Sequence, residues 1–428
     1  MIRLAERIRQ RTIQLPAFWV LVLILLAAAA DVAGPAGDSN GIIYIVIAVD
    51  TEPYRPNPWQ YSQALKLACL APDTDISQVA TVMEEQWREK YRDSSGDRLK
   101  ITWFIMSHEL FRYANNGGCT AIYDAMMKYK DRLEAFGDEL GWHYHHADWY
   151  DADGDGKSAW NQITTFDGTA YTHGTDCEIA ENMLNCLLTE RGFFPAVFRS
   201  GWTWENKDFS RWLDDIFPYD FSAYPPNQGT DKQGEPIRNR YDWTKAPRGY
   251  SGYHPDQNDY QKPGNLRRWI FRTVSPNIEH EWKRIIRAAQ NQGNQILCYT
   301  THSFDAPGKD IDRFLPVFLE LCKTSGVTVR FATASEAGAG ISQKSGLAAP
   351  TITISPQGDS LTIAAQGEIY QNIPYCVMRS SEGSSRRIFP SRVGLNRWVF
   401  SPYKAEKGKM VCAVTGLNGV TAVTVFEQ

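Results

Sequence analysis

Two carboxylates that could do chemistry stand at the end of an apolar run near the start of the sequence. Residues 42–49 form a largely β-branched stretch, typical of a strand that is buried on both faces, and Asp50 and Glu52 follow it directly. Side chains at positions i and i+2 of an extended chain point the same way. The two carboxylates therefore would act at one place, either as metal ligands or as a general base.

Three histidines lie within four residues at the end of a second strand-like stretch. His143 and His145 share one face of an extended chain, and His146 follows them. Three imidazoles this close together rarely serve packing alone. With a carboxylate they form a ligand set that suits Zn²⁺ or another divalent transition metal. Strand geometry favours His145 over His146 as the second imidazole ligand, and the sequence leaves both as candidates.

Two more apolar stretches end on residues that suit acid–base chemistry. Arg199 ends the stretch 195–199, and His302 directly follows the stretch 295–301. In folds with parallel strands, catalytic groups gather at the carboxyl ends of the strands. The carboxylates, the histidine cluster, the arginine and the last histidine together form a candidate metallohydrolase site, with one carboxylate as base and a separate histidine as acid.

The elements that must position these residues alternate between strand and helix. This alternation predicts a parallel sheet or barrel with right-handed crossovers. We expect strands at 42–49, 100–106, 139–146, 195–199, 269–274, 295–301 and 327–331, and helices at 76–91, 120–136, 176–191, 279–291 and 311–323. A long aromatic, Pro- and Gly-rich segment interrupts the pattern at 200–265, and its rings suit stacking on sugar surfaces.

A different kind of chain follows this region. Residues 337–350 are small, rich in Gly, Ala and Ser and almost uncharged, which is typical of a linker. Over 351–428, polar and apolar residues alternate in six short runs, which predicts a small antiparallel β-sandwich. We expect the first domain to span 31–336 and residues 31–349 to fold without the sandwich.

The first 30 residues have the composition of a targeting segment. Four arginines lie within the first eleven residues, and residues 12–30 carry no charge. This predicts either a signal peptide cleaved after Ala30 or an uncleaved anchor, because 19 helical residues reach about 28 Å and could span a membrane. In both cases we expect export to the periplasm or beyond, with attachment to the inner membrane if the segment is kept.

Export would place the eight cysteines in an oxidising compartment, where up to four disulfides can form. We expect the pairs Cys177–Cys186 and Cys376–Cys412, because each pair could lie within one small unit. Several of the others have the apolar surroundings of buried small hydrophobic residues. No Cys-x-x-Cys occurs, so we do not expect a thiolate zinc site.

An acidic loop matches the opening of a calcium-binding loop. Asp151, Asp153 and Asp155 alternate and are followed by Gly156, whereas Gln162 stands where such loops usually have a bidentate Glu. A Ca²⁺ site and a solvated acidic turn are both consistent with this pattern.

The composition of the whole chain excludes other classes of protein. The chain has 428 residues, 43% hydrophobic and 22% charged, which excludes a wholly disordered or fibrous protein. The formal net charge is −4 and no long basic run follows the first dozen residues. We therefore expect no nucleic-acid partner, and the sequence does not set the oligomeric state.

The order of the motifs resembles the polysaccharide deacetylase superfamily of carbohydrate esterases, over about residues 42–335. The segments similar to the family's motifs are Ala48-Val49-Asp50-Thr51-Glu52, Gly141-Trp142-His143-Tyr144-His145, Phe198-Arg199-Ser200, Tyr219-Asp220-Phe221-Ser222 and Thr301-His302-Ser303. The second is a His-x-His variant, since Ala147 stands where the family usually has a second histidine, four residues after His143.

The resemblance implies a role for each residue. It makes Asp50 the base, Glu52 and the histidines the metal ligands and His302 the acid, while Arg199 positions the base and Asp220 supports the site. It also implies an α/β fold, a deformed (β/α) barrel of about seven units, followed here by the sandwich, and removal of acetyl groups from an N- or O-acetylated polysaccharide. A barrel that binds glycan without turnover, and the same site acting on a non-sugar C–N bond, are the other hypotheses.

Overall fold

The structure is a computed structural model and describes residues 41–52, 77–108, 118–145, 147–150, 159–162, 176–224, 243–274, 279–402 and 408–427. The expected targeting segment, His146 and the acidic loop that begins at Asp151 lie outside these residues. Contacts group the chain from Gly41 to Gln428 into one compact unit. Among the described residues, no helix has the length and apolar character needed to cross a membrane.

Seven parallel strands close into a barrel. Their order around the ring is β1, β2, β3, β6, β7, β8 and β9, and β9 pairs again with β1. The strands are β1 (Ile43–Thr51), β2 (Ile101–Met106), β3 (Glu139–Tyr144), β6 (Val197–Ser200), β7 (Tyr219–Ala223), β8 (Trp269–Val274) and β9 (Gln295–His302). A short strand, β10 (Val329–Phe331), pairs with the first residues of β1, which β2 does not reach. The predicted α/β barrel of about seven units is confirmed.

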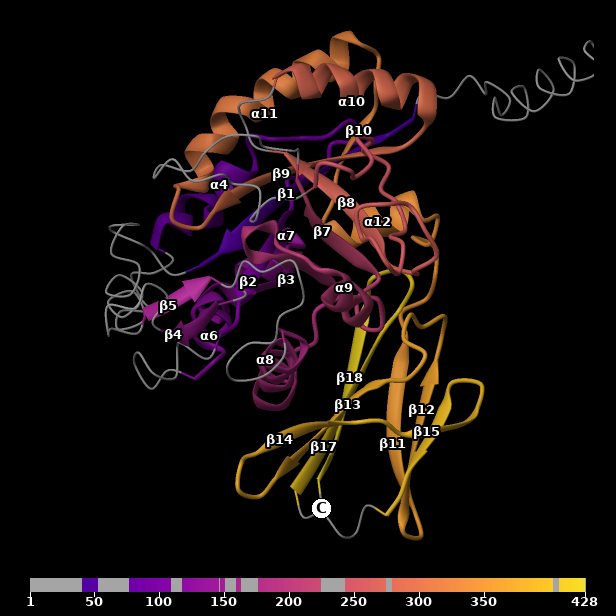
Figure 1. Ribbon diagram of the computed structural model, residues 1–428. Helices are drawn as coiled ribbons and strands as arrows, with labels where there is room; N and C mark the ends of the chain where they lie inside the picture. Colours follow the sequence, from indigo (N-terminus) through magenta and orange to yellow (C-terminus); the bar gives the residue numbers. More distant parts are fainter. Residues whose placement is uncertain are drawn as a thin grey trace, which may run out of the picture. The chain divides into compact units, whose positions relative to one another are not determined.

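Helices cover the outside of the barrel (Figure 1). They are α4 (Glu85–Arg88), α6 (Ala121–Met126), α7 (Lys130–Phe136), α8 (Asp176–Arg191), α9 (Lys207–Asp214), α10 (Glu279–Gln292) and α11 (Pro307–Thr324). A further helix, α12 (Ala334–Ile341), instead contributes alanines to the apolar cluster that fills the barrel. A hairpin of β4 (Ala147–Tyr150) and β5 (Ala159–Gln162) lies outside the ring. The predicted helix at 76–91 is instead a 3₁₀ helix at Ser77–Met83 followed by the short α4.

Alternation along β1 separates two apolar cores. Val46 and Ala48 belong to the cluster that fills the barrel, while Ile45 and Ile47 belong to the cluster between the strands and the helices. Asp50 has the same parity as the barrel-facing residues, and so does Glu52 just beyond the strand. Both carboxylates therefore lie at the carboxyl-terminal mouth of the barrel.

The chain from residue 351 forms two four-stranded antiparallel sheets, as expected of a sandwich. One sheet has the order β11-β12-β16-β15 and the other β14-β13-β17-β18. The strands are β11 (Thr351–Gln357), β12 (Ser360–Gln366), β13 (Tyr375–Ser380), β14 (Ser385–Ile388), β15 (Ser391–Gly394), β16 (Arg397–Phe400), β17 (Gly408–Thr415) and β18 (Thr421–Glu427). Among the described residues of this region, eight strands thus stand where six were predicted, because the short polar β14 and β15 lack an apolar alternation.

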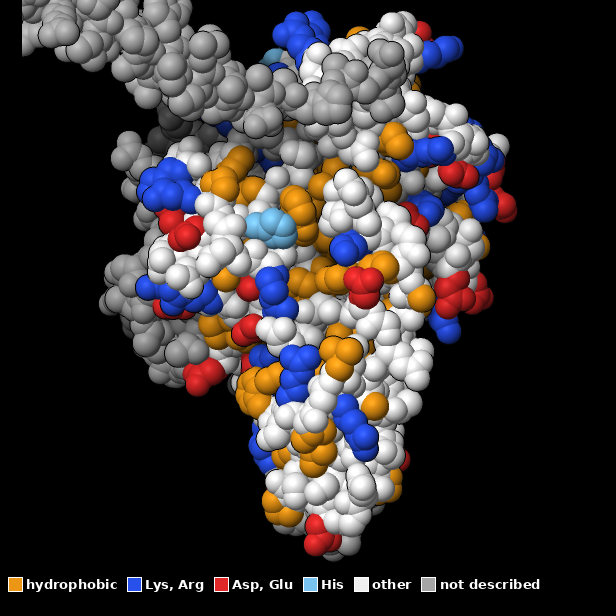
Figure 2. All heavy atoms as spheres, turned by 90° about the vertical axis from the view of Figure 1, so that its right-hand side faces the viewer, with side chains coloured by type: hydrophobic (Ala, Val, Ile, Leu, Met, Phe, Trp, Pro, Cys, Tyr) orange, Lys and Arg blue, Asp and Glu red, His pale blue; other side chains and the backbone are white. Residues whose placement is uncertain are grey.

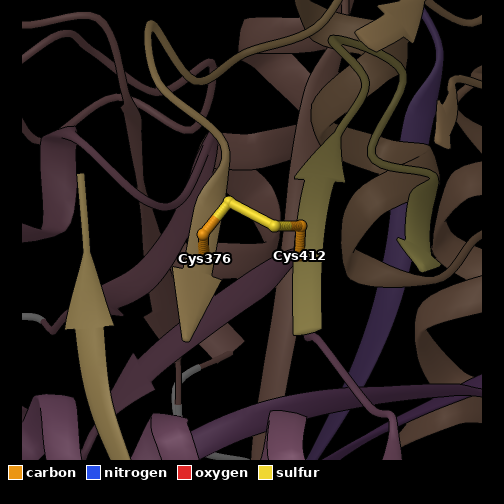
Figure 3. The surroundings of a disulfide bond; sticks show 2 residues. All are labelled: Cys376 and Cys412. Carbon is orange, nitrogen blue, oxygen red and sulfur yellow. A yellow bond between two sulfur atoms is a disulfide. The ribbon is translucent and has the colours of Figure 1, made fainter. Parts of the chain in front are cut away.

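A disulfide joins Cys376 of β13 to Cys412 of β17 inside the sandwich (Figure 3). The two residues face each other in the ladder, which confirms this predicted pair. The predicted pair Cys177–Cys186 is wrong. Both residues lie on α8, where nine residues of helix separate their Cα atoms by about 13.5 Å, beyond the roughly 7 Å that a disulfide can bridge.

Two strands of one sheet of the sandwich, β13 and β17, are buried on both faces. Cys376 and Met378 of β13 face the sandwich core, whereas Tyr375 and Val377 belong to the main cluster of the barrel. The Tyr375 hydroxyl donates a hydrogen bond to Asn185 Oδ1 of α8 at 2.9 Å. The two parts therefore share apolar packing, and where one domain ends and the other begins stays a prediction.

The expected linker at 337–350 begins within helix α12. Thr333 and Glu336 form a capping box at the start of this helix: the Thr333 hydroxyl accepts from the Glu336 N–H, and the Glu336 carboxylate accepts from the Thr333 N–H. The first residues of the expected linker, 337–341, thus belong to a helix that starts with a capping box.

Removal of the sandwich is expected to destabilise the barrel, because it would expose the surface of α8 on which Tyr375 and Val377 pack. We now expect a protein that ends at residue 349 to melt at least about 5 °C below the full chain, or to aggregate, instead of folding independently. Thermal unfolding followed by circular dichroism tests this. Equal melting temperatures and solubility would show that the shared packing contributes little.

Large hydrophobic side chains remain exposed on the sandwich. Phe389, Val393 and Leu395 are 62%, 58% and 86% exposed. Figure 2 shows hydrophobic side chains next to Lys and Arg side chains on this lower part of the molecule. The hydrophobic residues are interspersed with charge, as is normal for the surface of a soluble domain.

Candidate metal centre

Four strands bring the predicted site residues to one end of the barrel. Parallel pairing places Asp50 of β1 beside His302 of β9, and His143 of β3 beside Arg199 of β6. Each of these residues lies at or near the carboxyl end of its strand. The mouth therefore gathers side chains that are far apart in the sequence.

Glu52, His143 and His145 form a compact set of possible metal ligands. His143 Nε2 lies 3.2 Å from Glu52 Oε1 and 2.9 Å from His145 Nε2, and His145 Nε2 lies 2.9 Å from Glu52 Oε1. Three ligand atoms bound to one cation at about 2.0–2.2 Å lie about 2.8–3.6 Å apart. The donor set and its spacing thus fit one divalent cation, and all three side chains are buried.

The backbone of β6 fixes the orientation of His143. The Nδ1 atom of His143 lies 2.9 Å from the carbonyl oxygen of Arg199. A carbonyl oxygen only accepts, so Nδ1 carries the proton and Nε2 presents its lone pair toward Glu52 and His145. Metal-binding histidines are commonly held in this way by a second hydrogen bond.

His145 depends on the absence of a side chain at Gly201. A Cβ atom added to Gly201 would overlap the imidazole ring of His145. The strand β6 ends at Ser200, and its first residue beyond the strand thus has to be glycine for His145 to reach the other ligands. The sequence could not show this requirement, because residues 145 and 201 are remote along the chain.

Gly201→Ala is therefore expected to displace His145 and to weaken the binding of a divalent cation by about 10–100-fold, the usual cost of disturbing the partners of a metal ligand. Titration of the apoprotein with Zn²⁺ measures the effect. Gly346→Ala serves as the control, since a Cβ there meets no atom within 4 Å. A Gly201→Ala protein that binds Zn²⁺ like the wild type would show that His145 is not a ligand.

Asp50 is held by Arg199 beside the ligand set. The Nε atom of Arg199 donates to both carboxylate oxygens of Asp50, at 2.7 and 3.0 Å, and Nη1 donates to the carbonyl of Phe221 and the hydroxyl of Thr273. Burial is the largest single effect on the pKa of Asp50 and would raise it. The charge and hydrogen bond of Arg199 and the charges of His143 and His302 together outweigh burial, so the pKa lies below its ordinary value. Asp50 is thereby kept ionised and fixed in orientation.

His302 lies at the edge of the mouth, with a side chain that is 42% exposed. Its Nδ1 atom is 2.9 Å from Asp305 Oδ2. Burial lowers the pKa of His302, but the hydrogen bond to Asp305 and the charges of Glu52 and Asp50 raise it by more, so the pKa lies above its ordinary value. The protonated form of this histidine is therefore favoured, as a general acid requires.

Ser303 positions the carboxylates, a role that the sequence did not reveal. Its hydroxyl accepts from the Glu52 N–H at 3.1 Å and donates to the Glu52 carbonyl at 2.8 Å, while its own N–H donates to the carbonyl of Asp50 at 2.9 Å. These three bonds tie the end of β9 to the end of β1. The only available signal was the position of Ser303 next to His302.

Asp220 does not join the cluster at the mouth. On β7, Tyr219 and Phe221 face the barrel interior, so Asp220 points to the other side of the strand. There it accepts from Arg268 Nε at 3.2 Å, and Arg268 also pairs with Glu205. Burial, with the nearby charge of Asp220, raises the pKa of Glu205 against the opposing effect of Arg268.

Asp220 acts on the site only at a distance. Its carboxylate accepts from the hydroxyl and the N–H of Ser222, and the Ser222 hydroxyl accepts from the N–H of Ser200 at 2.9 Å. This chain of hydrogen bonds holds the end of β6, next to Arg199. The structure therefore brings together Asp50, Glu52, His143, His145, Arg199 and His302, and leaves Asp220 behind them.

Comparison with known proteins gives only distant likenesses. No family model matches the sequence, and no curated protein matches it. Among solved structures, an allantoinase is similar at 12% identity and a TM-score of 0.36, covering 72% of this chain and 93% of that one. Another similar structure is a GH57 branching enzyme from the hyperthermophilic archaeon Thermococcus kodakaraensis, in complex with glucose and additives. Its identity is 12% and its TM-score 0.28, and the match covers 68% of this chain and 70% of that one.

A peptidoglycan deacetylase from Bdellovibrio bacteriovorus is similar at 14% identity and a TM-score of 0.25, covering 72% of this chain and 59% of that one. At such scores, none of the three likenesses bears on the reaction. The functional argument therefore rests on the geometry of the site and on the sequence motifs.

Proposed function

We propose that this protein is a metal-dependent hydrolase that removes acetyl groups from an N- or O-acetylated polysaccharide. The observation that supports it most is the convergence, at one mouth of the barrel, of a three-atom ligand set with a carboxylate held by an arginine. A structural metal site would need neither the Asp50–Arg199 pair beside it nor a histidine with a raised pKa at its edge. Both suit acid–base catalysis.

A divalent cation, for which we propose Zn²⁺, would supply Lewis-acid chemistry on Glu52, His143 and His145. Asp50 would accept the proton of the attacking water, with its carboxylate aimed by Arg199. The oxygen of that water would form a bond to the carbonyl carbon of the acetyl group, and the C–N or C–O bond from this carbon to the sugar would break. His302 would give its proton to the departing nitrogen or oxygen, and acetate is released.

The polysaccharide part of the proposal rests on the sequence motifs and their order, which resemble those of the polysaccharide deacetylase superfamily. We also propose that the protein is exported, through the arginine-rich and apolar residues 1–30, and that an uncleaved segment 12–30 would attach it to the inner membrane. The disulfide Cys376–Cys412 supports export, because disulfides persist mainly in oxidising compartments.

Acetate release from a panel of acetylated glycans, measured with and without a chelator, tests the proposed function. We expect release from at least one glycan, its loss on chelation and its return on adding Zn²⁺. Release that resists chelation would contradict the metal-dependent reaction. Release only from small acetamides would assign the site to a non-sugar C–N bond.

The pH dependence of the reaction should reflect the ion pair between His302 and Asp305. His302 must be protonated to act as acid, so activity is present below its pKa and is lost as pH rises through it. Asp305→Asn removes a group that raises this pKa, and we expect the alkaline limb of kcat to move to lower pH. Asp208→Asn, an exposed aspartate on α9, is the control. An alkaline limb that stays in place would show that another group sets it.

A further inference from the structure

A hollow of about 340 Å³ on the outside of the barrel is lined by three arginines. Arg284 and Arg287 come from α10, and Arg248 from the segment before β8; Tyr250 and Asn291 complete the lining. The Ile296 N–H donates to the carbonyl of Tyr250, which places the hollow beside the start of β9. The metal centre lies at the other ends of the strands, so the hollow is a separate place on the molecule.

The positive charge of this hollow is only partly balanced. Arg284 pairs with Glu281, whose oxygens lie 2.7 Å from Nη1, and its Nη2 donates to the carbonyl of Arg248 at 2.9 Å. For Arg248 and Arg287, the described part of the chain provides no carboxylate within 4.0 Å. These two guanidinium groups are exposed and have no carboxylate partner among the residues that the structure describes. Their positive charges, gathered around one hollow, attract anions.

A fourth arginine lies buried behind the hollow. Arg272 of β8 is 5% exposed, and its Nη2 donates to the carbonyl of Pro247 at 2.7 Å. Its Nε–H has no hydrogen-bond partner among the residues that the structure describes. Burial lowers the pKa of Arg272 to about 10, and the charges of Arg284 and Arg248 add to this against the opposing effect of Tyr253. The buried guanidinium of Arg272 therefore lies in the positive electrostatic potential of Arg248 and Arg284.

We propose that this hollow binds an oxyanion group of the phosphate type. Each guanidinium group offers paired N–H donors that match the geometry of such an oxyanion, whereas the ammonium group of a lysine acts as a point charge. The group could belong to a free phosphate ion or to a phosphate carried by a polymer, and both present the same oxygens to Arg248 and Arg287. This site is independent of the proposed hydrolase reaction.

Calorimetric titration with inorganic phosphate, at constant ionic strength set with chloride, tests the site. We expect one phosphate per chain for the wild type, and an affinity at least about tenfold lower for the double variant Arg248→Ala, Arg287→Ala, since hydrogen bonds to charged groups typically exceed a tenfold effect. Lys283→Ala is the matched control, because it removes the same charge from α10 outside the hollow. We expect its affinity to equal that of the wild type.

Phosphate could also bind to a metal ion at the barrel mouth, so His143→Ala is titrated in parallel. We expect this variant to keep phosphate binding. Binding that is lost in His143→Ala and kept in the double arginine variant would overturn the proposal, as would equal affinities of the wild type and the double variant. Titration with polyphosphate separates the two sources: tighter binding per chain supports a phosphate carried by a polymer, and equal binding supports the free ion.

Discussion

His143→Ala is expected to release the metal ion and to lower acetate release by more than about 10²-fold. Even the hydrogen-bond partners of metal ligands are typically worth 10–100-fold, and His143 is proposed as a ligand itself. Its Nε2 faces both Glu52 and His145, so its loss removes a third of the ligand set. Metal content by elemental analysis and acetate release by an enzymatic assay measure the two effects.

The controls separate this effect from general damage to the fold. His280→Ala removes a histidine whose side chain is 76% exposed on α10, and it should keep both metal and activity. His145→Ala should lose the metal like His143→Ala, whereas His146→Ala should keep it. Undiminished metal in a folded His143→Ala protein would refute the ligand assignment.

The strand ends could be predicted from the sequence because parallel strands obey a simple geometry. An apolar run such as 43–49 predicts a buried strand. Because alternate side chains of a strand share one face, Asp50 and Glu52 face the same way as Val46 and Ala48. The next step, that several such ends meet at one mouth, follows from the closed ring of strands.

Asp220 shows where that reasoning stops. The run 219–223 is a strand, but its apolar residues alternate such that the aspartate faces away from the barrel, where Arg268 neutralises it. The direction of the Asp220 side chain depends on which face of β7 points into the barrel. Tyr219 and Phe221 occupy that face in the closed ring, and the sequence alone does not show this. The resemblance to a family motif placed the residue near the site without fixing its direction.

Other features depend on contacts between remote segments. Cys177 and Cys186 are close in sequence and far apart on a straight helix, whereas Cys376 and Cys412 are 36 residues apart and meet across a ladder. The double burial of β13 could not be predicted either, because its apolar stretch suits a single sandwich core equally well. Gly201 and Ser303 gain their roles from neighbours on other strands.

His302→Ala is expected to lower kcat for an acetylated glycan by roughly 10²–10⁴-fold, the usual contribution of a general acid, while the metal content stays unchanged. His302 lies outside the ligand set and is held by Asp305, so its removal should leave Glu52, His143 and His145 in place. A leaving group that needs no proton, such as the phenolate of an activated aryl acetate, should be spared most of this loss.

Asp50→Asn provides the matched comparison, because the base is needed whatever group departs. We expect its activity to fall on both the glycan and the aryl acetate, while His302→Ala falls mainly on the glycan. Equal turnover by His302→Ala and the wild type would remove this histidine from the mechanism. Glycan binding measured on the same proteins separates an enzyme from a binding module: a wild type that binds acetylated glycans and releases no acetate from any of them would make the barrel a binding protein. The raised pKa of His302 would then have no proton transfer to serve.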